Sequence, residues 1–594
     1  MLLMNKSRRR LGAVATACLL SVALPAAPAW AQKVKNKTKP ATGMETSVTV
    51  DIPTIDAVGS TIDEATIGDI LRGNIAGHAQ QLADLDATSI GVPEIVVSVT
   101  SQNADKSYDA TITFSDLVFE GVVDGVAAGV SLGGIAMITE EGTFDFGTMT
   151  AADLNIGGML GIYGLVDRGQ TGLETIYTDF SSVGGTMQAE DVSCTIGAMN
   201  GAEFKARPLK TSFVEMMGMA QALEDDPDDL DPALLGQVIR MYADILTAFE
   251  TTEVTFDGLS CEGTDDVDRP MTFSIAGMTM GGMSPGIYPA ISMDGFDIVV
   301  EGDGAMSLDN FTMKQMDLSG LIATLESAPE NVDERWLEAN ARALFPAIEG
   351  FSLSGFDMDI PDPDNDGARL KATIGNVDLT LARYLNGLPT SMDLSAANIL
   401  AELPEDSGDE TVEQLRALGI TDIDAGFRVA AAWDEANSSI NIEEMSFTGA
   451  DLATVFLAGT IANATADLFA LDTDTALAAG MSVAVKGLDL TVTDAGLSDI
   501  VLAVVAAEQG ADPATLRPVF AGLAQGSVIA MMAGAADAAK LGEAINTFVS
   551  GKAKTLAIGI RAKQDPGLSL PDFIAAEEDP TTLLGKVNIS AEAK

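Results

Sequence analysis

Residues 291–326 constrain the fold of this 594-residue chain more than any other stretch, because they contain a complete strand-turn-strand-helix pattern. Phe296, Ile298 and Val300 alternate with outward positions at a period of two, which is typical of a half-buried strand. The Glu-Gly-Asp-Gly run at 301–304 predicts a tight turn, since glycine supplies the positive φ that hairpins need. A returning strand over 305–313 precedes an Asp-Leu step that begins a helix.

Related patterns recur along the chain. Residues 144–149 lead to Asp153-Leu154 in the same way, and the string at 354–357 (Ser-Gly-Phe-Asp) resembles the string at 294–297 (Asp-Gly-Phe-Asp) before a helix-like segment at 380–388. True repeats would share one extended sheet and need their neighbours for burial, whereas short matches also arise by chance. Short connections favour antiparallel pairing. The predicted fold class is α+β: a long antiparallel, curved β-sheet built of repeated strand-turn-strand-helix units, with inserted helical hairpins.

The pattern of segments predicts a division of the chain. The first helix is expected over 61–85, a second helical region over 319–347 is split by Pro329, and a third spans 497–549. The predicted parts are a signal peptide (1–31), a flexible basic lead (32–45), an N-terminal α+β unit (46–207), a helical hairpin insertion (208–250), central β-repeat units with helices (251–410) and a C-terminal β-meander plus helices (411–594).

The first 31 residues resemble a secretory signal. Lys6 and residues 8–10 form a positive region, residues 11–27 are apolar, and Ala29-Trp30-Ala31 is a small-x-small cleavage site before Gln32. A lipoprotein reading at Cys18 is the less favoured alternative. We therefore expect cleavage between Ala31 and Gln32, export, and residence in a bacterial periplasm, with no transmembrane segment in the mature chain.

The charge balance excludes one class of partner. The chain holds 33 Lys and Arg against 87 Asp and Glu. Eight of those bases precede residue 41, which leaves 25 bases against 87 acids beyond residue 40. Such a surface repels phosphate backbones, so the sequence predicts no nucleic-acid partner.

Two cysteines remain after removal of the predicted signal. In an oxidising compartment Cys194 and Cys261 are most simply a disulfide, and two buried free thiols are the alternative. The bridge would close a long loop around the helical segment at 208–250.

Few residues point to catalysis. The chain has one histidine, His78, which we interpret as an ordinary helix residue. Two Gly-x-Ser-x-Gly strings resemble the nucleophile motif of serine hydrolases, but neither has the context that the motif needs. The first ends in Ser284-Pro285-Gly286, and Pro285 lacks the N–H that an oxyanion hole uses. The second, at 129–133, is followed by a predicted strand where the motif needs a helix. We therefore expect no enzyme and no cofactor.

One string resembles a calcium loop. Asp362, Asp364 and Asp366 occupy the first, third and fifth ligand positions, followed by Gly367. The twelfth position is Thr373, which offers no bidentate carboxylate, so an acidic β-turn is the favoured interpretation and weak calcium binding is the alternative.

Two features resemble a known group of proteins: the strand meanders with Gly-Phe-Asp turns, and closing strands such as 554–560 (Lys-Thr-Leu-Ala-Ile-Gly-Ile). In these features the chain is similar to uncharacterised proteobacterial envelope proteins with long β-repeat sheets, and distantly to the AsmA-type β-groove proteins. This resemblance implies a long curved sheet and a role at the cell envelope. It carries over no functional residue.

Two functions remain open. The first is a non-enzymatic binding or scaffold module for an apolar lipid ligand in a β-groove, or for an envelope protein partner. Seven methionines motivate it, with ordinary core packing as the alternative interpretation; they are Met278, Met280, Met283, Met293, Met306, Met313 and Met316. The second is an acidic interaction or adhesion module with weak calcium binding.

Overall fold

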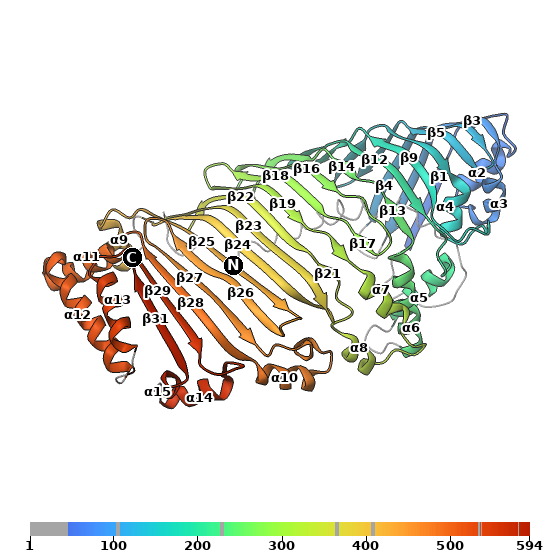
Figure 1. Ribbon diagram of the computed structural model, residues 1–594. Coiled ribbons are helices and arrows are strands. Elements are labelled where there is room, and N and C mark those ends of the chain that lie inside the picture. Colours follow the sequence, from blue (N-terminus) through green and yellow to red (C-terminus); the bar gives the residue numbers. More distant parts are fainter. Residues whose placement is uncertain are drawn as a thin grey trace. The chain divides into compact units, whose positions relative to one another are not determined.

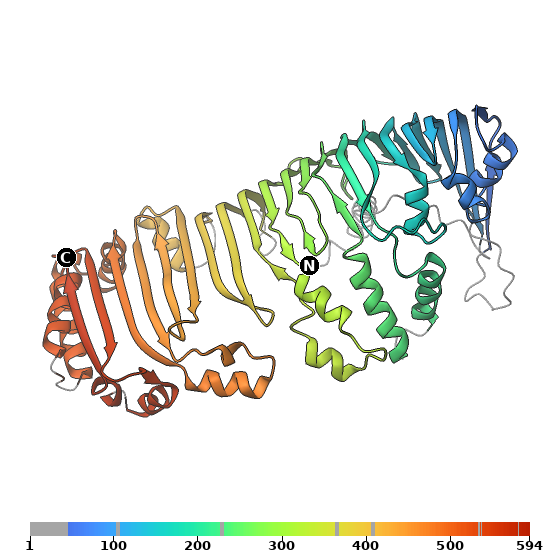
Figure 2. The same cartoon turned by 45° about the vertical axis from the view of Figure 1, so that its right-hand side comes forward.

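The computed structural model describes residues 45–102, 107–225, 231–362, 368–404, 410–532, 535, 537–579 and 581–594 (Figure 1). The chain divides into two compact units. Unit 1 comprises residues up to 222 together with 248–278 and 298–302, and unit 2 comprises 223–247, 279–297 and 303–594. Each unit contains a curved antiparallel sheet with helices in its connections (Figures 1 and 2).

The sheet of unit 1 contains long and short strands. Its strands are β1 (Glu45–Asp51), β2 (Asp56–Val58), β3 (Ala87–Gln102), β4 (Ser107–Val123), β5 (Val126–Leu132), β6 (Gly134–Thr139), β7 (Gly142–Phe146), β8 (Met149–Asn155), β9 (Glu174–Ser182), β10 (Gly185–Ala189), β11 (Val192–Ile196), β12 (Met199–Ala206), β13 (Phe249–Thr251), β14 (Val254–Phe256), β15 (Leu259–Thr264) and most of β16 (Pro270–Met280). The long strand β4 pairs with both β5 and β6, so short strands lie end to end beyond it.

Short helices pack against the first strands of unit 1. They are α2 (Glu64–Leu71), η1 (Ala76–His78), α3 (Ala79–Ala83) and α4 (Ile156–Ile162). A further helix, α5 (Phe213–Asp225), has its residues 213–222 in unit 1 and its last three in unit 2. Ile67 of α2 packs with Leu85, Ile90 and Val122 in a buried cluster. The single helix expected over 61–85 is therefore wrong: Asp63 caps α2 through the N–H of Thr66, and Gly73, with φ of 110°, separates α2 from the next helical turn.

Unit 2 continues with longer antiparallel hairpins. Its strands are β18 (Ile291–Val300, of which 298–300 belong to unit 1), β19 (Gly304–Met313), β22 (Gly350–Pro361), β23 (Arg369–Leu385), β24 (Leu388–Glu402), β25 (Asp422–Asp434), β26 (Ser439–Gly449), β27 (Ala453–Ala462), β28 (Ala484–Asp494), β29 (Thr555–Ala562), β30 (Leu568–Ser569) and β31 (Val587–Ala593). The short strands β17 (Ile287–Tyr288), β20 (Met316–Asp317) and β21 (Ala347–Ile348) form a separate small sheet.

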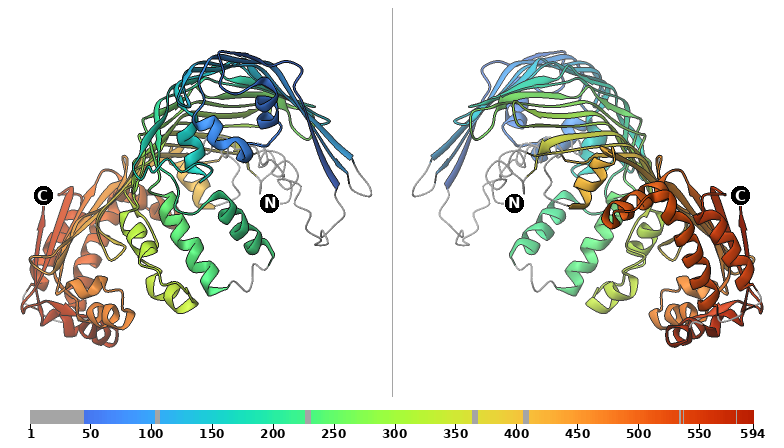
Figure 3. Two further views of the ribbon diagram at one scale, coloured as in Figure 1. Left: turned by 90° about the vertical axis from the view of Figure 1, so that its right-hand side faces the viewer. Right: turned by 90° about the vertical axis from the view of Figure 1, so that its left-hand side faces the viewer.

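The helices of unit 2 lie in the connections at the strand ends. They are α6 (Pro232–Ile245), α7 (Ser319–Glu326), α8 (Glu334–Asn340), α9 (Glu410–Ala417), η2 (Ala466–Phe469), α10 (Thr473–Ser482), α11 (Leu497–Gln509), α12 (Pro513–Met531), α13 (Ala538–Val549), α14 (Leu570–Glu578) and α15 (Thr581–Leu584). Helices α6, α7 and α8 form a small cluster (Figure 3), with Ile239, Leu325 and Val332 in its core. Figure 1 shows α8, α10, α14 and α15 at one edge of the strands and α9 at the other.

The segment 291–326 folds as the sequence predicts. Strands β18 and β19 form the two arms, and α7 begins at Ser319, whose N–H donates a hydrogen bond to the carboxylate of Asp317 at 2.8 Å. Strands β7 and β8 followed by α4 have the same order. Helices α5 and α6 fall within the expected helical region 208–250, and α6 packs against α7.

Two local expectations are wrong. Residues 380–388, expected as a helix, belong to the end of β23, the turn at 386–387 and the first residue of β24. The Gly-Phe-Asp strings lie inside β18 and β22 instead of in turns, with φ of 61° at Gly295 and 65° at Gly355. Positive φ is common in turns, but here both glycines lie within strands, and the register of β22 with β19 and with β23 continues on either side of Gly355 without a shift. The strand-turn-strand-helix pattern of 291–326 is therefore not repeated after β22 and β23, because β24 follows them directly without a helix.

Among the residues that the structure describes, none of the helices combines the length and the apolar character needed to cross a bilayer.

Candidate functional site

The strand register of unit 2 aligns apolar side chains in rows that cross the sheet. Residues directly opposite each other in an antiparallel pair lie on the same face. Following these pairs from β19 through β22–β29 to β31 gives two adjacent rows. The first row is Phe311, Leu353, Val377, Ala396, Phe427, Phe447, Val455, Val492, Leu556 and Ala593; the second is Met313, Phe351, Leu379, Leu394, Val429, Met445, Leu457, Leu490, Ile558 and Ala591. We call these twenty residues the apolar stripe.

The opposite face of the same strands is polar. The row between the two rows of the apolar stripe points the other way, and it consists of Thr312, Ser352, Asp378, Ser395, Arg428, Ser446, Phe456, Thr491, Ala557 and Glu592. On this face Lys314 forms an ion pair with Asp378 at 2.8 Å. The two faces therefore differ sharply in chemistry, as in a sheet with one face against an apolar phase.

The polar face has its own electrostatic network. Arg428 lies 2.8 Å from the carboxylate of Asp393 and 2.9 Å from that of Glu444. The hydrogen bonds and charge of Arg428 hold the pKa of Asp393 below its usual range. The lowered pKa keeps Asp393 charged at neutral pH, so its ion pair with Arg428 makes this face strongly polar.

The apolar stripe is only partly covered. Phe447 is 57% exposed, Met445 is 41% exposed and Val455 is 38% exposed, although all three are large apolar side chains. Ala396 and Leu556 are its buried members. Adjacent exposed apolar side chains of this size indicate a surface that meets another apolar group.

Helical segments cover one end of the apolar face. Trp433 of β25 lies two alternations beyond Val429, and its ring packs on Phe469 of η2 with the ring centroids 5.0 Å apart. The indole N–H of Trp433 donates to the carbonyl of Ala464 at 2.7 Å. The segment that contains η2 therefore covers the apolar face at this end of β25, whereas Met445 and Phe447 of β26 stay exposed.

Unit 1 contains a comparable row. The register from β1 to β16 aligns nine residues on one face: Val50, Val97, Ile112, Met137, Phe144, Met187, Cys194, Cys261 and Phe273. Val97 is buried in a cluster that includes Leu71 of α2, whereas Ile112 and Phe144 are partly buried. Each unit therefore aligns a row of apolar residues on one face of its sheet.

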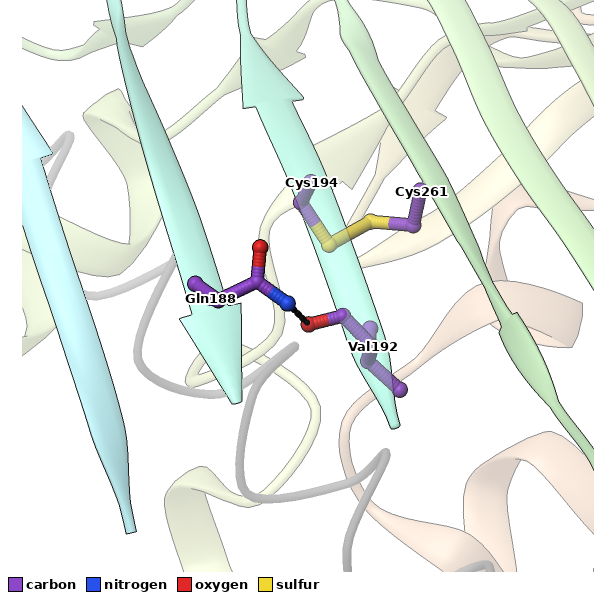
Figure 4. The surroundings of a disulfide bond; sticks show 4 residues. All are labelled: Gln188, Val192, Cys194 and Cys261. Atoms are coloured by element: carbon purple, nitrogen blue, oxygen red, sulfur yellow. Dashed lines mark hydrogen bonds between the residues drawn. A yellow bond between two sulfur atoms is a disulfide. The ribbon is translucent and has the colours of Figure 1, made fainter. Parts of the chain in front are cut away.

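The structure pairs Cys194 with Cys261, as the sequence predicts. The two residues lie directly opposite each other on β11 and β15, and their Sγ atoms are bonded (Figure 4). Beside the bridge, the side-chain amide of Gln188 donates to the carbonyl of Val192 at 3.4 Å. The disulfide is part of the apolar row of unit 1 and also encloses α5 and α6 within its 67-residue loop.

The seven methionines singled out by composition do not form one cluster. All are partly buried. Met313 belongs to the apolar stripe, Met306 lies opposite Met358, and Met316 belongs to the small sheet of β17, β20 and β21. The apolar face depends on Phe, Leu and Val from β22–β28, which no local composition signal reveals.

The remaining candidate residues are distributed as follows. The N–H of Asp362 donates a hydrogen bond to the carbonyl of Ala368, whereas Asp364 and Asp366 lie outside the described residues. Within the described ranges, no group of three or more His, Cys, Asp or Glu side chains could hold a metal ion. The cleavage residues Ala31 and Gln32 also lie outside the described part of the chain.

His78 belongs to a surface hydrogen-bond network. Its Nε2 lies 3.0 Å from Asp69, and its Nδ1 lies 2.6 Å from the amide oxygen of Gln81. These hydrogen bonds, first that to Gln81 and then that to Asp69, raise the pKa of His78. The partners tie the ends of α2 and η1 together, which is a structural arrangement.

Comparison with known proteins gives one match. A family model described as an uncharacterized protein matches residues 446–594, about a quarter of the chain. This match begins in β26 and includes β27, β28, β29 and β31 of the apolar stripe. No curated protein and no solved structure matches the chain.

Proposed function

We propose that this chain is a non-enzymatic, exported envelope protein that binds the acyl chain of a lipid along the apolar stripe of unit 2. The observation that carries the proposal is the pair of adjacent rows, which are apolar at every position across ten strands and exposed at Met445, Phe447 and Val455.

The dimensions and chemistry of the stripe suit an acyl chain. Neighbouring strands lie about 4.8 Å apart, so ten strands extend over about 43 Å. Each methylene moved from water to an apolar surface contributes about 0.8 kcal/mol, and ten of them contribute about 8 kcal/mol before the entropy of ordering is subtracted. Since the twenty side chains include no titratable or hydroxyl group, this face offers binding and no acid-base chemistry.

Export is supported by two features. The leader at 1–31 has the pattern of a secretory signal, and the bond between Cys194 and Cys261 is of a kind that persists in oxidising compartments. The periplasm is the compartment that fits both.

The direct test is to purify the mature chain from its own periplasm and to examine it by native mass spectrometry and by organic extraction. We expect a co-purifying lipid at near-stoichiometric amounts. Clean apo protein in a fixed complex with another protein would contradict the proposal and favour the acidic interaction module.

A matched pair of variants localises the ligand. Phe447→Thr combined with Met445→Thr removes two exposed apolar side chains from the stripe, and Phe456→Thr removes an aromatic side chain from the opposite face of the neighbouring strand. Loss of contacts worth about 1.5–3 kcal/mol should weaken binding of a fluorescent fatty-acyl probe about tenfold or more. Phe456→Thr should leave the affinity within about twofold; equal effects of the two changes would place the ligand elsewhere.

A further inference from the structure

We propose that the outward side of helix α12 is an interaction surface on which a second copy of this chain docks, so that the α12 helices of the two copies pack against each other. This association is independent of the proposed lipid ligand.

Helix α12 forms an outer layer of unit 2. It packs on α13, which in turn packs on β31 (Figure 1). Gly542 of α13 lies at the contact between the two helices, since a Cβ there would be 3.0 Å from Ile529 of α12. Ala521 and Met532 are buried on the inner side of α12. The opposite side of the helix is exposed along its whole length.

This outward side of α12 is apolar where a surface helix is normally charged. Its exposed residues are Thr515, Pro518, Val519, Gly522, Leu523, Gly526, Ser527 and Ala530. Val519 is 55% exposed and Leu523 is 59% exposed. The only charged residue between 513 and 531 is Arg517, which is largely buried in an ion pair with Asp499 of α11. A helix that is apolar on all sides is normally covered, which indicates a partner for this side.

The two glycines of the outward side have no role within the folded chain. A Cβ at Gly522 or at Gly526 would meet nothing within 4 Å, and neither glycine has a positive φ. Glycine inside a helix lowers its stability relative to alanine. Small residues on a helix surface allow the backbone of a second helix to approach closely. Since the chain itself does not need the missing side chains, they favour a closely packed partner helix.

The outward side of α12 is complementary to itself. Residues four apart form ridges along a helix. One such row is Thr515, Val519, Leu523 and Ser527, and the neighbouring row is Pro518, Gly522, Gly526 and Ala530. The first row projects, whereas the second is low at its two glycines. In a two-fold symmetric pair the ridge of each helix fits the furrow of the other, which is the requirement for an interface between identical copies.

Charge permits two copies to meet at α12. Acids outnumber bases by 54 in the whole chain, so two copies repel each other over most of their surface. The outward side of α12 carries no carboxylate. On the same helix the nearest acid is its N-cap, Asp512, ten residues before Gly522 and therefore about 15 Å along the axis. That separation exceeds the Debye length of about 8 Å at physiological ionic strength.

The size of the surface predicts a weak, reversible dimer. A contact confined to one helix of 19 residues on each copy buries less than the roughly 1,200 Å² of a standard interface. Association is therefore expected in the range of about 10–200 µM.

Sedimentation velocity of the mature chain over about 1–200 µM tests the association. We expect the sedimentation coefficient to rise from that of a monomer toward that of a dimer as the concentration increases. Raising NaCl from about 10 mM to about 150 mM should lower the dimer Kd by at least about threefold, because screening reduces the repulsion between two acidic copies. An interface held by ion pairs would weaken instead.

Two double variants locate the contact. Gly522→Leu with Gly526→Leu fills the furrow and should raise the dimer Kd by about tenfold or more. Their side chains have open space in the single chain, and leucine favours a helix, so the thermal midpoint should not fall. The control is Gly218→Leu with Gly320→Leu, which changes two exposed glycines of α5 and α7 that also meet nothing within 4 Å. It should leave the dimer Kd within about twofold.

Three results would overturn the proposal. The first is an unmodified chain that stays monomeric at every concentration. The second is a dimer with the same Kd in both double variants, which would place the interface elsewhere. The third is a monomeric chain that floats with phosphatidylcholine vesicles unless Gly522 and Gly526 are replaced, which would assign the outward side of α12 to a membrane surface.

Discussion

At the scale of single residues, Gly258 shows how strictly the backbone of unit 1 depends on a missing side chain. Its φ is 87°, and a Cβ at this position would lie 2.1 Å from the carbonyl oxygen of Ile275. We expect Gly258→Ala to lower the free energy of unfolding by at least about 2 kcal/mol, because both the positive φ and the close carbonyl oppose it. Urea denaturation followed by circular dichroism measures this change.

Gly172 supplies the matched control in the same unit. A Cβ there meets nothing within 4 Å. Gly172→Ala should change stability by less than about 1 kcal/mol in either direction. Similar losses in both variants would show that the backbone at Gly258 adjusts freely.

The candidate residues differ in how well sequence could predict them. The pairing of Cys194 with Cys261 is predicted from the two cysteines that remain once residues 1–31 are interpreted as a secretory signal. The repeated string around Gly295 and Gly355 is visible in the sequence, yet the tolerance of glycine for positive φ serves turns and strand interiors alike, so the sequence alone does not place these glycines inside strands. Only the pairing of neighbouring strands distinguishes the two.

At the scale of elements, the disulfide is the covalent link between strands β11 and β15. Removing the constraint on a 67-residue loop should cost about 4 kcal/mol by the loop-entropy estimate. We expect dithiothreitol to lower the thermal midpoint of the unmodified chain. The double variant Cys194→Ala and Cys261→Ala should start at the lower midpoint and show no further response to dithiothreitol.

The outcome that would contradict this expectation is an unmodified chain whose midpoint is insensitive to reduction while mass spectrometry confirms two free thiols. In that case the register of β11 and β15 alone would hold the two strands together.

Sequence patterns predict elements well where local and long-range forces agree. Helix α7 was predicted because Asp317 and the apolar spacing both favour it. Residues 380–388 resemble a helix in sequence because Leu381, Leu385 and Leu388 are spaced like a helical face. There the pairing of β23 with β24 outweighs the local preference, and such long-range pairing is not encoded in any single segment.

At the scale of the whole chain, charge is the dominant feature. Acids outnumber bases by 54, so mutual repulsion destabilises the folded state at low ionic strength. We expect the thermal midpoint to rise by at least about 2 °C between about 10 mM and about 150 mM NaCl, as the Debye length shortens. Differential scanning calorimetry measures this shift.

Calcium chloride and magnesium chloride at matched ionic strength provide the control. General screening predicts equal midpoints in the two salts. A higher midpoint in calcium alone, lost in Asp362→Asn, would reveal a specific site at the 362–366 loop.

The apolar stripe is formed by residues from ten strands, which explains why no single stretch of sequence reveals it. Alternation in each strand was visible, for example at Phe296, Ile298 and Val300, but the apolar stripe arises only when ten strands are set in register. The seven methionines between 278 and 316 suggest an apolar surface by composition, but only Met313 among them belongs to the stripe. A binding face made by cross-strand neighbours is invisible to local patterns.

The rows of the apolar stripe also restrict how the chain can change in length. An insertion of one residue within β27 would reverse the parity of the strand, turning Val455 or Leu457 to the hydrated face and bringing polar neighbours onto the apolar one. Insertions in the connection at 463–483, where α10 lies, leave every parity intact. Length variation among descendants of this chain should therefore gather in the connections, while the strands keep an invariant count between their ends.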